Sequence, residues 1–347
     1  FESLGLMDIE QNKSMREDAL FRTYSMTRQI TTVAALILYQ EGEFEFDDPI
    51  QMYLPDFENQ SVLVDSQGTN INQTKARVND ITVQHLITHT SGLGSRSSSL
   101  YRENRVRDKN FTLDQMVSNA AQIPLFQDPG TEFRYGIHAT ILGKLIEVWS
   151  GRPLREFLEE ELLSKLNMNS TMFWAAGDDQ DRLAGLYRPV NGELNPYQIE
   201  EVPYTERPRL IEGGVGLLSS VRDFVNFSQM ILDGGVFEER RILTPEVAEL
   251  VYENAVPQAA MPIGNTGYWA GSGWTWGGFN LVIDADAYNF PVSEGTIWWD
   301  GSAGTRYFID RQQDIIIVIM AQVSPSSGGG FRENFSRLVD ASILERR

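Results

Sequence analysis

The 347-residue chain contains no cysteine, so disulfide bonds, thiol nucleophiles and cysteine-ligated metal sites are all excluded. No stretch approaches the roughly 20 apolar residues that a membrane-spanning helix needs. Only five of the 29 basic residues are lysine, and the formal charge is −19. A surface this acidic repels phosphate backbones, so nucleic acid is not expected as a partner.

What the chain does have is enough apolar material for a core. Hydrophobic residues make up 41% of it and aromatic residues 11%, which suits one large domain or two ordinary ones. The chain opens FESLGLMDIE and does not begin with a methionine, and we expect an N-terminal piece to precede it. The compartment therefore stays open, with a slight preference for the cytoplasm. The sequence does not determine the oligomeric state.

Periodicity divides the chain into three parts. FESLGLMDIE partly alternates and predicts a strand, whereas the residues after Ser25 repeat at helical spacing. Residues from about 80 to 260 are mostly helical, and those after about 265 are rich in β-forming residues. We therefore predict an α/β (α+β) fold: an antiparallel sheet flanked by helices and built from both termini, with an inserted mostly helical domain. The expected domains are 1–50 with 265–347, and 51–264, with the active site in the cleft between them.

Individual runs predict the elements of these parts. The β-rich runs TRYFID and DIIIVIMAQV are separated by RQQD, which predicts a hairpin. Ser220, followed three residues later by Asp223, predicts a capped helix start. The predicted helices are TVQHLITHTSGL, TLDQMVSNAAQI, ATILGKLIEVWSG, PLREFLEEELLSKL, SVRDFVNFSQMILDGG and the tail FRENFSRLVDASILERR.

The stretch YSMTRQ places Ser25 at a helix start, three residues before Arg28. An isolated serine there is most simply a helix cap. The functional interpretation is a nucleophile whose own backbone N–H helps to hold an oxyanion. The layout is that of a Ser-x-x-Lys motif in which the lysine is replaced by arginine.

Two further groups could complete such a site. Tyr135 follows a PGT turn directly before a helix; it is either a half-buried aromatic or a phenol that bonds to Ser25 and relays its proton. WWDGSAG is a glycine-rich bend around Gly301. Its glycines indicate a bulge or a close backbone approach, or a place where the Ser302 N–H completes an oxyanion hole.

Five blocks in this order resemble the serine β-lactamase-like superfamily over about residues 1 to 340. They are FRTYSMTRQITTVAALILYQEGEFEFDDPI, ITVQHLITHTSGL, PGTEFRYGIHATILGKLIEVWSGRPLREFL, GGVGLLSSVRDFVNFSQMIL and WWDGSAGTRYFIDRQQDIIIVIMAQ. That superfamily includes class C β-lactamases, DD-peptidases and family VIII carboxylesterases. The resemblance implies an acyl-enzyme on Ser25, proton relay by Tyr135, and an oxyanion held by the Ser25 and Ser302 N–H groups.

Two departures favour the esterase branch of this superfamily. Class C β-lactamases have Tyr-x-Asn at the second motif, whereas this chain has Ile137. At the third motif the chain reads Trp299-Asp300-Gly301, similar to the Trp-x-Gly of family VIII esterases. A cationic anchor for a substrate carboxylate is not expected at this strand, and Trp299 is expected to be an apolar wall. The resemblance implies small neutral esters with short acyl chains as substrates, and no cofactor.

Arg28 is the main departure from the family pattern. Guanidinium stays protonated, so Arg28 cannot take the role of the motif lysine. We expect it to act as a fixed cation that lowers the pKa of Tyr135, which would then be the general base. The alternatives are a catalytically impaired ligand-binding homologue, natural or engineered, an acyltransferase that uses the same acyl-enzyme, and a β-lactamase or peptidase.

Other catalytic arrangements fit the sequence less well. No GxSxG stretch is present, so a Ser-His-Asp hydrolase is disfavoured. His85 and His89 are four residues apart, but no further ligand completes a zinc motif, and no metal site is predicted. His89 is expected to be a structural histidine with satisfied nitrogens. Asp300 is expected to be solvated or paired with an arginine.

Overall fold

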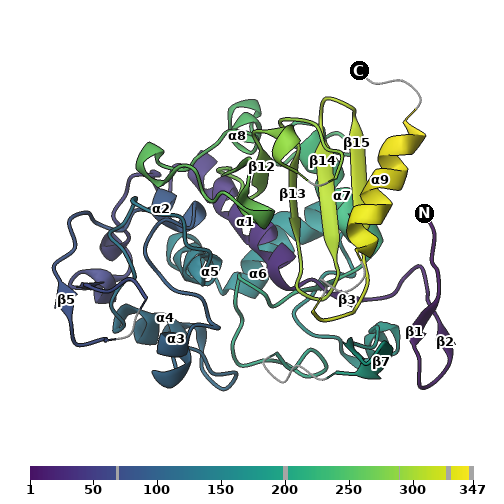
Figure 1. The fold of residues 1–347 in the computed structure, drawn as a ribbon, viewed down its shortest axis with the longest axis horizontal. Helices are drawn as coiled ribbons and strands as arrows, with labels where there is room; N and C mark the ends of the chain where they lie inside the picture. Colours follow the sequence, from purple (N-terminus) through teal and green to yellow (C-terminus); the bar gives the residue numbers. More distant parts are fainter. Residues whose placement is uncertain (68–69, 198–201, 289, 326–329, 344–347) are drawn as a thin grey trace.

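The computed structural model describes residues 1–67, 70–197, 202–288, 290–325 and 330–343. Its centre is a five-stranded antiparallel sheet in the order β11-β12-β13-β14-β15. These strands are Ser272–Trp274, Asn280–Val282, Ile297–Asp300, Arg306–Asp310 and Ile315–Ile319. In Figure 1 the sheet and α9 (Phe331–Ser342) lie to the right and the helices α2 to α5 to the left.

The predicted hairpin is confirmed. Strands β14 and β15 pair in register, with Phe308 opposite Ile317 and Ile309 opposite Ile316. The connecting turn ends at Asp314, whose φ of 60° is left-handed, a conformation that aspartate tolerates better than most residues. β-Branched residues fill β15 because they pack well on a pleated surface. The predicted tail helix is α9, and residues 344–347 lie outside the described part of the chain.

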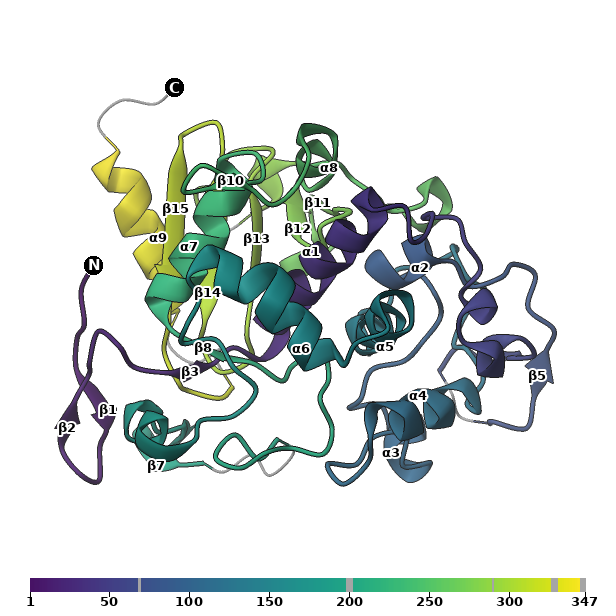
Figure 2. The same cartoon turned by 180° about the vertical axis from the view of Figure 1, so that it is seen from behind.

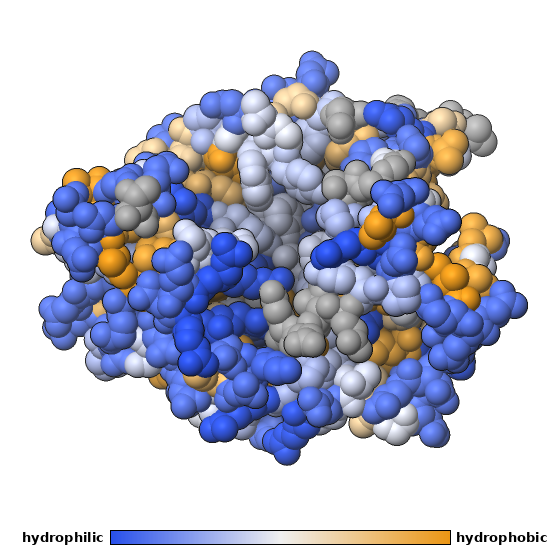
Figure 3. Space-filling model, turned by 60° about the horizontal axis from the view of Figure 1, so that its bottom comes forward, coloured by the Kyte–Doolittle hydropathy of each residue, from blue (hydrophilic) through white to orange (hydrophobic). Residues whose placement is uncertain are grey.

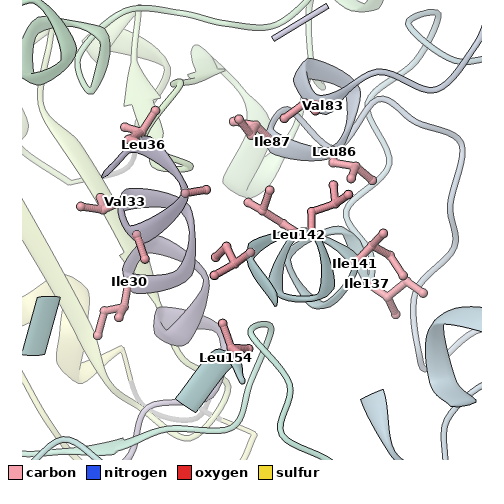
Figure 4. Close-up of a cluster of buried hydrophobic side chains, with 14 of the residues drawn as sticks. Ile30, Val33, Leu36, Val83, Leu86, Ile87, Ile137, Ile141, Leu142 and Leu154 are labelled. Atoms are coloured by element: carbon pink, nitrogen blue, oxygen red, sulfur yellow. The ribbon is translucent and has the colours of Figure 1, made fainter. Parts of the chain in front are cut away.

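Helix α1 (Thr27–Gln40) runs between the sheet and the helices α2 to α5. All residues from Thr27 to Leu38 are buried, and a helix that is buried on every side forms the centre of a core. Figure 4 shows its side chains Ile30, Val33 and Leu36 in the same cluster as residues of the neighbouring helices α2, α5 and α6. The start of α1 is therefore held in place from all sides.

Most of the remaining helices lie within the predicted runs, but α3 and α8 were not predicted and α2 ends at Ile87, before the end of its predicted run. Ser220 caps α7, because its hydroxyl accepts a hydrogen bond from the Asp223 N–H at 3.2 Å. The run from 154 to 166 begins as an α-helix and continues as π and 3₁₀ turns. The other α-helices are α2 (Val83–Ile87), α3 (Ser99–Glu103), α4 (Leu113–Ala121), α5 (His138–Ser150), α6 (Leu154–Leu158), α7 (Val221–Leu232) and α8 (Pro245–Leu250).

The N-terminal strand differs from the expectation in one respect. Strand β1 (Leu6–Asp8) pairs with β2 (Lys13–Ser14) and is not part of the five-stranded sheet. Figure 2 shows this hairpin away from the sheet. The described sheet is thus formed by C-terminal strands, and the N-terminal part contributes α1 instead. Short pairs complete the strands: β3 (Phe21–Arg22) with β8 (Leu218–Ser219), β4 (Val62–Leu63) with β5 (Thr74–Lys75), β6 (Tyr187–Val190) with β7 (Glu193–Pro196), and β9 (Val236–Phe237) with β10 (Arg240–Arg241).

The predicted fold class is confirmed: an antiparallel sheet flanked by helices, with a mostly helical region between α1 and the sheet strands. Helix α7 packs against β14 and β15, although the predicted helical segment 51–264 included it. The two-domain division stays a prediction.

The face in Figure 3 is largely hydrophilic, with separate hydrophobic patches. Within the described ranges, no helix is long and apolar enough to span a membrane.

Candidate active site

Ser25 stands on a short 3₁₀ turn, Tyr24–Met26, that leads directly into α1. The preceding residue, Tyr24, has a φ of +44°, which is unusual for a residue with a side chain and costs of the order of 1–3 kcal/mol. Burial offsets this cost, because Tyr24 is fully buried and its ring meets that of Tyr204 edge to face. The left-handed residue turns the chain abruptly, so Ser25 is presented at the start of a rigid helix while remaining half-buried.

Arg28 lies one helical turn after Ser25 and is almost completely buried. Its Nη1 donates a hydrogen bond to the Gly136 carbonyl at 2.7 Å, and its guanidinium carbon lies 4.4 Å from the centre of the Tyr135 ring. Burial lowers the pKa of Arg28 from its ordinary value, and Tyr135 opposes that change. Arg28 thus bridges the serine helix and the tyrosine segment as a cation held against a π-face.

Tyr135 comes from the segment immediately before α5, and its hydroxyl meets two groups of the site. The Trp299 Nε1–H donates a hydrogen bond to the Tyr135 oxygen at 3.0 Å. The side chain of Ser25 lies in the same cavity lining and lowers the pKa of the phenol. The predicted association of Ser25, Arg28 and Tyr135 is therefore present as geometry.

The net effect on the phenol is opposite to the expected one. Burial raises the pKa of Tyr135, and this outweighs the lowering caused by Arg28 and by the hydrogen bonds from Ser25 and Trp299. Arg28 lowers the pKa of Tyr135, as expected, but the net pKa still lies above its ordinary value, because low-dielectric surroundings disfavour the phenolate more than one cation favours it. Tyr135 is a neutral phenol at neutral pH in the unliganded site.

Gly301 brings the end of β13 against the serine segment. A side chain at this position would collide with the Thr23 carbonyl and with the Thr305 hydroxyl, so glycine is required by the close approach of two backbones. Ser302 follows directly and is exposed; its N–H as an oxyanion donor stays a prediction. Trp299 is buried and is more than an apolar wall, because it also holds the Tyr135 hydroxyl.

Asp300 is paired with arginine, as expected, and the pairing is double. Its Oδ2 lies 2.9 Å from both Arg306 Nη2 and Arg332 Nη1, and it accepts a hydrogen bond from the Tyr268 hydroxyl at 2.7 Å. Arg306 also contacts Glu333 of α9 at 3.2 Å. This network joins α9 to the end of β13 and so supports the position of Trp299 and Gly301.

A pair of histidines lies behind Tyr135. The His89 ring centre is 4.6 Å from that of Tyr135 and 4.5 Å from that of His138. Burial lowers the pKa of His138 to about 3 and that of His89 well below its ordinary value, so both are neutral near pH 7. The Nδ1 of His89 has no hydrogen-bond partner among the described residues. The expected full satisfaction of His89 was therefore wrong for that atom.

A cavity of about 80 Å³ opens beside Ser25, Arg28 and Tyr135. Sequence reasoning missed several of its lining residues, because they come from loops distant in the sequence. Among them are Arg107 and Glu212, which form a buried ion pair with Nη2 and Oε1 2.8 Å apart. The lining also includes Ser95, Arg96, Met116, Gly136, Ile137, Thr140, Gly214 and Val215.

Comparison with known proteins places this geometry in a family. Protein Rv1367c of Mycobacterium tuberculosis is 29% identical over 332 residues, covering 93% of this chain and 82% of the relative. Esterase EstB of Burkholderia gladioli is 27% identical over 347 residues, covering 92% and 81%. The structure of EstCE1, a hydrolase with promiscuous acyltransferase activity, superimposes with a TM-score of 0.83 at 25% identity, covering 96% of this chain and 88% of EstCE1.

The family model described as Beta-lactamase matches residues 1–341, nearly the whole chain. The resemblance of the five sequence blocks and the five-stranded antiparallel sheet beside α1 agree with that match. This chain therefore belongs to the beta-lactamase family.

Proposed function

We propose that this protein is a serine hydrolase that cleaves small carboxylic esters through an acyl-enzyme on Ser25. The observation that carries the proposal is that Ser25, Tyr135 and Arg28 line one cavity, with the Arg28 guanidinium 4.4 Å from the centre of the Tyr135 ring. A nucleophile within reach of a proton acceptor, which is itself oriented by other groups, is the general pattern of covalent catalysis. The similarity of this chain to Esterase EstB and to the hydrolase EstCE1 supports the esterase assignment.

In the proposed mechanism, the reaction begins with attack of the Ser25 oxygen on the ester carbonyl. The serine proton passes to the Tyr135 oxygen, which must be a phenolate at that moment because Arg28 cannot accept a proton. The carbonyl oxygen becomes an oxyanion that the Ser25 and Ser302 N–H groups stabilise. The C–O bond then breaks, and the departing alkoxide takes the proton from Tyr135, which leaves an acyl ester on Ser25.

Deacylation repeats these steps with water as the nucleophile. Tyr135 accepts a proton from water as the water oxygen attacks the acyl carbonyl, and it returns the proton to the Ser25 oxygen as the acid leaves. Throughout, Arg28 favours the charged form of Tyr135 electrostatically, and Trp299 fixes the phenol oxygen by its hydrogen bond. Ser25, Tyr135 and Ser302 are the proposed catalytic groups, and no cofactor is needed by these steps.

Acyl transfer is the second candidate, because the same acyl-enzyme could be released by an alcohol or an amine. The structural similarity to EstCE1, a hydrolase with promiscuous acyltransferase activity, favours this possibility. Adding a short alcohol during turnover and measuring ester product against free acid distinguishes the two outcomes. A β-lactamase or peptidase is disfavoured by Ile137 and Trp299, and we expect no opening of nitrocefin.

The proposal is tested with p-nitrophenyl butyrate as substrate. We expect the parent to hydrolyse it and the variant Ser25→Ala to lose at least about 10³-fold in kcat. We expect Arg28→Lys to gain about tenfold at pH 7, because a buried lysine has a lowered pKa and can accept a proton. Labelling of Ser25 by a fluorophosphonate supplies a readout that does not depend on the choice of ester.

Three results would change the proposal in different ways. A parent that is inert but revived by Arg28→Lys is a catalytically impaired homologue of an esterase. Activity that survives in Ser25→Ala assigns the nucleophile to another residue. Inert proteins that also resist the fluorophosphonate would leave a ligand-binding role as the function of this site.

A further inference from the structure

Aromatic rings cluster around the phenol of Tyr135. The ring centre of Trp269 lies 6.0 Å from that of Tyr135, 5.0 Å from that of Phe133 and 5.7 Å from that of Trp299. The Trp274 ring centre lies 4.7 Å from that of Trp299. Trp274 and Trp299 are buried, whereas Phe133, Tyr135 and Trp269 are half-buried. Packing within the protein therefore leaves part of three aromatic side chains accessible next to the proposed proton acceptor.

The short turn that carries Trp269 is anchored by the arginine network around Asp300. The hydroxyl of the preceding residue, Tyr268, donates a hydrogen bond to Asp300 Oδ2 at 2.7 Å. The same hydroxyl accepts hydrogen bonds from Arg306 Nη2 at 3.0 Å and from Arg332 Nη2 at 3.1 Å. A side chain that is held in position before a ligand arrives loses little entropy when the ligand binds. Trp269 is thus a preorganised ring beside Tyr135.

The cavity beside Ser25 is too small for an aromatic ring. Its volume is about 80 Å³, whereas an apolar cavity of about 150 Å³ is the size known to hold benzene. Tyr135 belongs to the lining of this cavity, but Phe133 and Trp269 are not among the described residues that line it. A short acyl group in the cavity therefore leaves the aromatic cluster to another part of the substrate.

The proposed mechanism indicates which part of the substrate meets the cluster. The departing alkoxide takes a proton from the Tyr135 oxygen, so the two oxygens must approach to about 3 Å. With the acyl group in the cavity, the substituent of that alkoxide extends past the phenol toward its other neighbours, Trp269 and Phe133. Aromatic rings attract one another in edge-to-face or offset contacts with centres about 4.5–7 Å apart, so these side chains favour an aromatic substituent.

We propose that the natural substrate is an ester of an aromatic alcohol, and that Trp269 and Phe133 bind the ring of this alcohol beside Tyr135. This inference rests on the proposed function, because it uses the transfer of a proton from Tyr135 to the departing alkoxide. It concerns the alcohol half of the ester and leaves the acyl half to the cavity.

The test compares benzyl butyrate with cyclohexylmethyl butyrate. The two esters share the acyl group and the carbon skeleton of the alcohol, and only the benzyl ring is aromatic. We expect the parent to prefer benzyl butyrate about fivefold in kcat/KM, after subtraction of the uncatalysed rates. We expect Trp269→Leu to lower this ratio about fivefold and Trp269→Phe, which keeps an aromatic ring, to retain most of it. Differences in intrinsic reactivity between the esters cancel when the ratios of variant and parent are compared.

The matched control is Trp174→Leu. Trp174 is also half-buried, but within the described part of the chain its ring lies near the guanidinium groups of Arg155 and Arg207 and contacts no ring of the cluster. This variant should keep the parental ratio. A Trp269→Leu variant that also keeps the parental ratio would overturn the proposal. An equal loss of activity toward both esters would overturn it as well, because it would give Trp269 a structural role only.

The two proposals can fail separately. If both esters are hydrolysed through Ser25 and their ratio does not depend on Trp269, the esterase assignment stands and the aromatic subsite falls. If neither ester is turned over, saturation-transfer NMR of Ser25→Ala with benzyl alcohol and with cyclohexylmethanol measures binding without cleavage. A benzyl alcohol signal that is lost in Ser25→Ala/Trp269→Leu supports the subsite even though the hydrolase assignment fails. Equal signals from the two alcohols, or a signal that survives in the double variant, overturn it.

Discussion

Two groups of buried or half-buried arginines lie near the candidate active site, and they differ in their surroundings. Arg306 and Arg332 share the Asp300 carboxylate, and Arg306 also contacts Glu333. Arg28, Arg96 and Arg107 have one acid in their shared lining, Glu212, within the described residues. The first group is closed, whereas the second opens on a cavity.

The two groups of arginines therefore have different roles: the first supports the structure, and the second contains the arginine of the proposed catalytic site. In the closed group every charge has a partner, and its effect is to hold α9 and the end of β13 together. In the open group the charges meet Tyr135, Ser25 and the cavity. Burying charge is costly in both places, and within the open group Arg28 is the cation that lies against the Tyr135 ring of the proposed site.

The largest expected effect is a loss of catalytic rate at the site that contains Arg28 and Tyr135. Tyr135→Phe removes the hydroxyl that accepts the Ser25 proton and leaves the ring beneath Arg28. Because general base catalysis contributes about 10²- to 10⁴-fold, we expect kcat/KM for p-nitrophenyl butyrate to fall by that factor with little change in thermal stability. A variant with parental activity would remove Tyr135 from the mechanism.

The next effect is a loss of folding stability when the closed group around Asp300 is broken. Asp300→Asn removes the charge that two buried arginines share, and breaking such a pair costs about 3–5 kcal/mol. We expect the free energy of unfolding in urea to fall by about 3 kcal/mol. Asp286→Asn, at an exposed carboxylate, is the control and should stay close to the parent. Equal stability of the two variants would contradict the closed network.

The smallest effect is on the pH dependence of the open group. Because burial raises the pKa of Tyr135 above its ordinary value, the reactive phenolate fraction grows about tenfold with each pH unit below that pKa. We expect log kcat/KM to rise with a slope near 1 from pH 7 to pH 9. The histidines cannot produce this slope, because the pKa of His85 is about 4, that of His138 about 3 and that of His89 is well below its ordinary value.

The control for this profile is Arg28→Lys, which introduces a second group able to lose a proton and should flatten the slope. A parental profile that is already level at pH 7 would mean that the phenolate forms more easily than burial allows. In that case Arg28 would dominate the pKa of Tyr135, as the sequence alone suggested.

Local patterns predicted a large part of the fold and the members of the site. The β-rich runs on either side of RQQD indicated the β14–β15 hairpin, and the spacing of Ser25, Arg28 and Tyr135 within recognisable blocks indicated which residues to bring together. Both signals work because they depend on neighbouring residues. Their catalytic roles stay predictions.

What the sequence did not reveal depends on long-range contacts. The pairing of β1 with β2 rather than with the sheet is a choice of partner that a partly alternating strand does not encode. The net pKa direction of Tyr135 depends on burial contributed by several elements. Arg96 and Glu212 lie in loops with no catalytic motif, so only folding brings them to one cavity.

The close approach of Gly301 to the Thr23 carbonyl means that the shape of the proposed oxyanion site and the choice of acyl group depend on different parts of the chain. The oxyanion site of the proposed mechanism depends on two backbones pressed against each other, with no side chain between them. The lining of the cavity, in contrast, is made by side chains of other segments, such as Met116 and Thr140. Under the proposed mechanism, exchanging these side chains alters which acyl groups fit while the backbone around Ser25 keeps its shape.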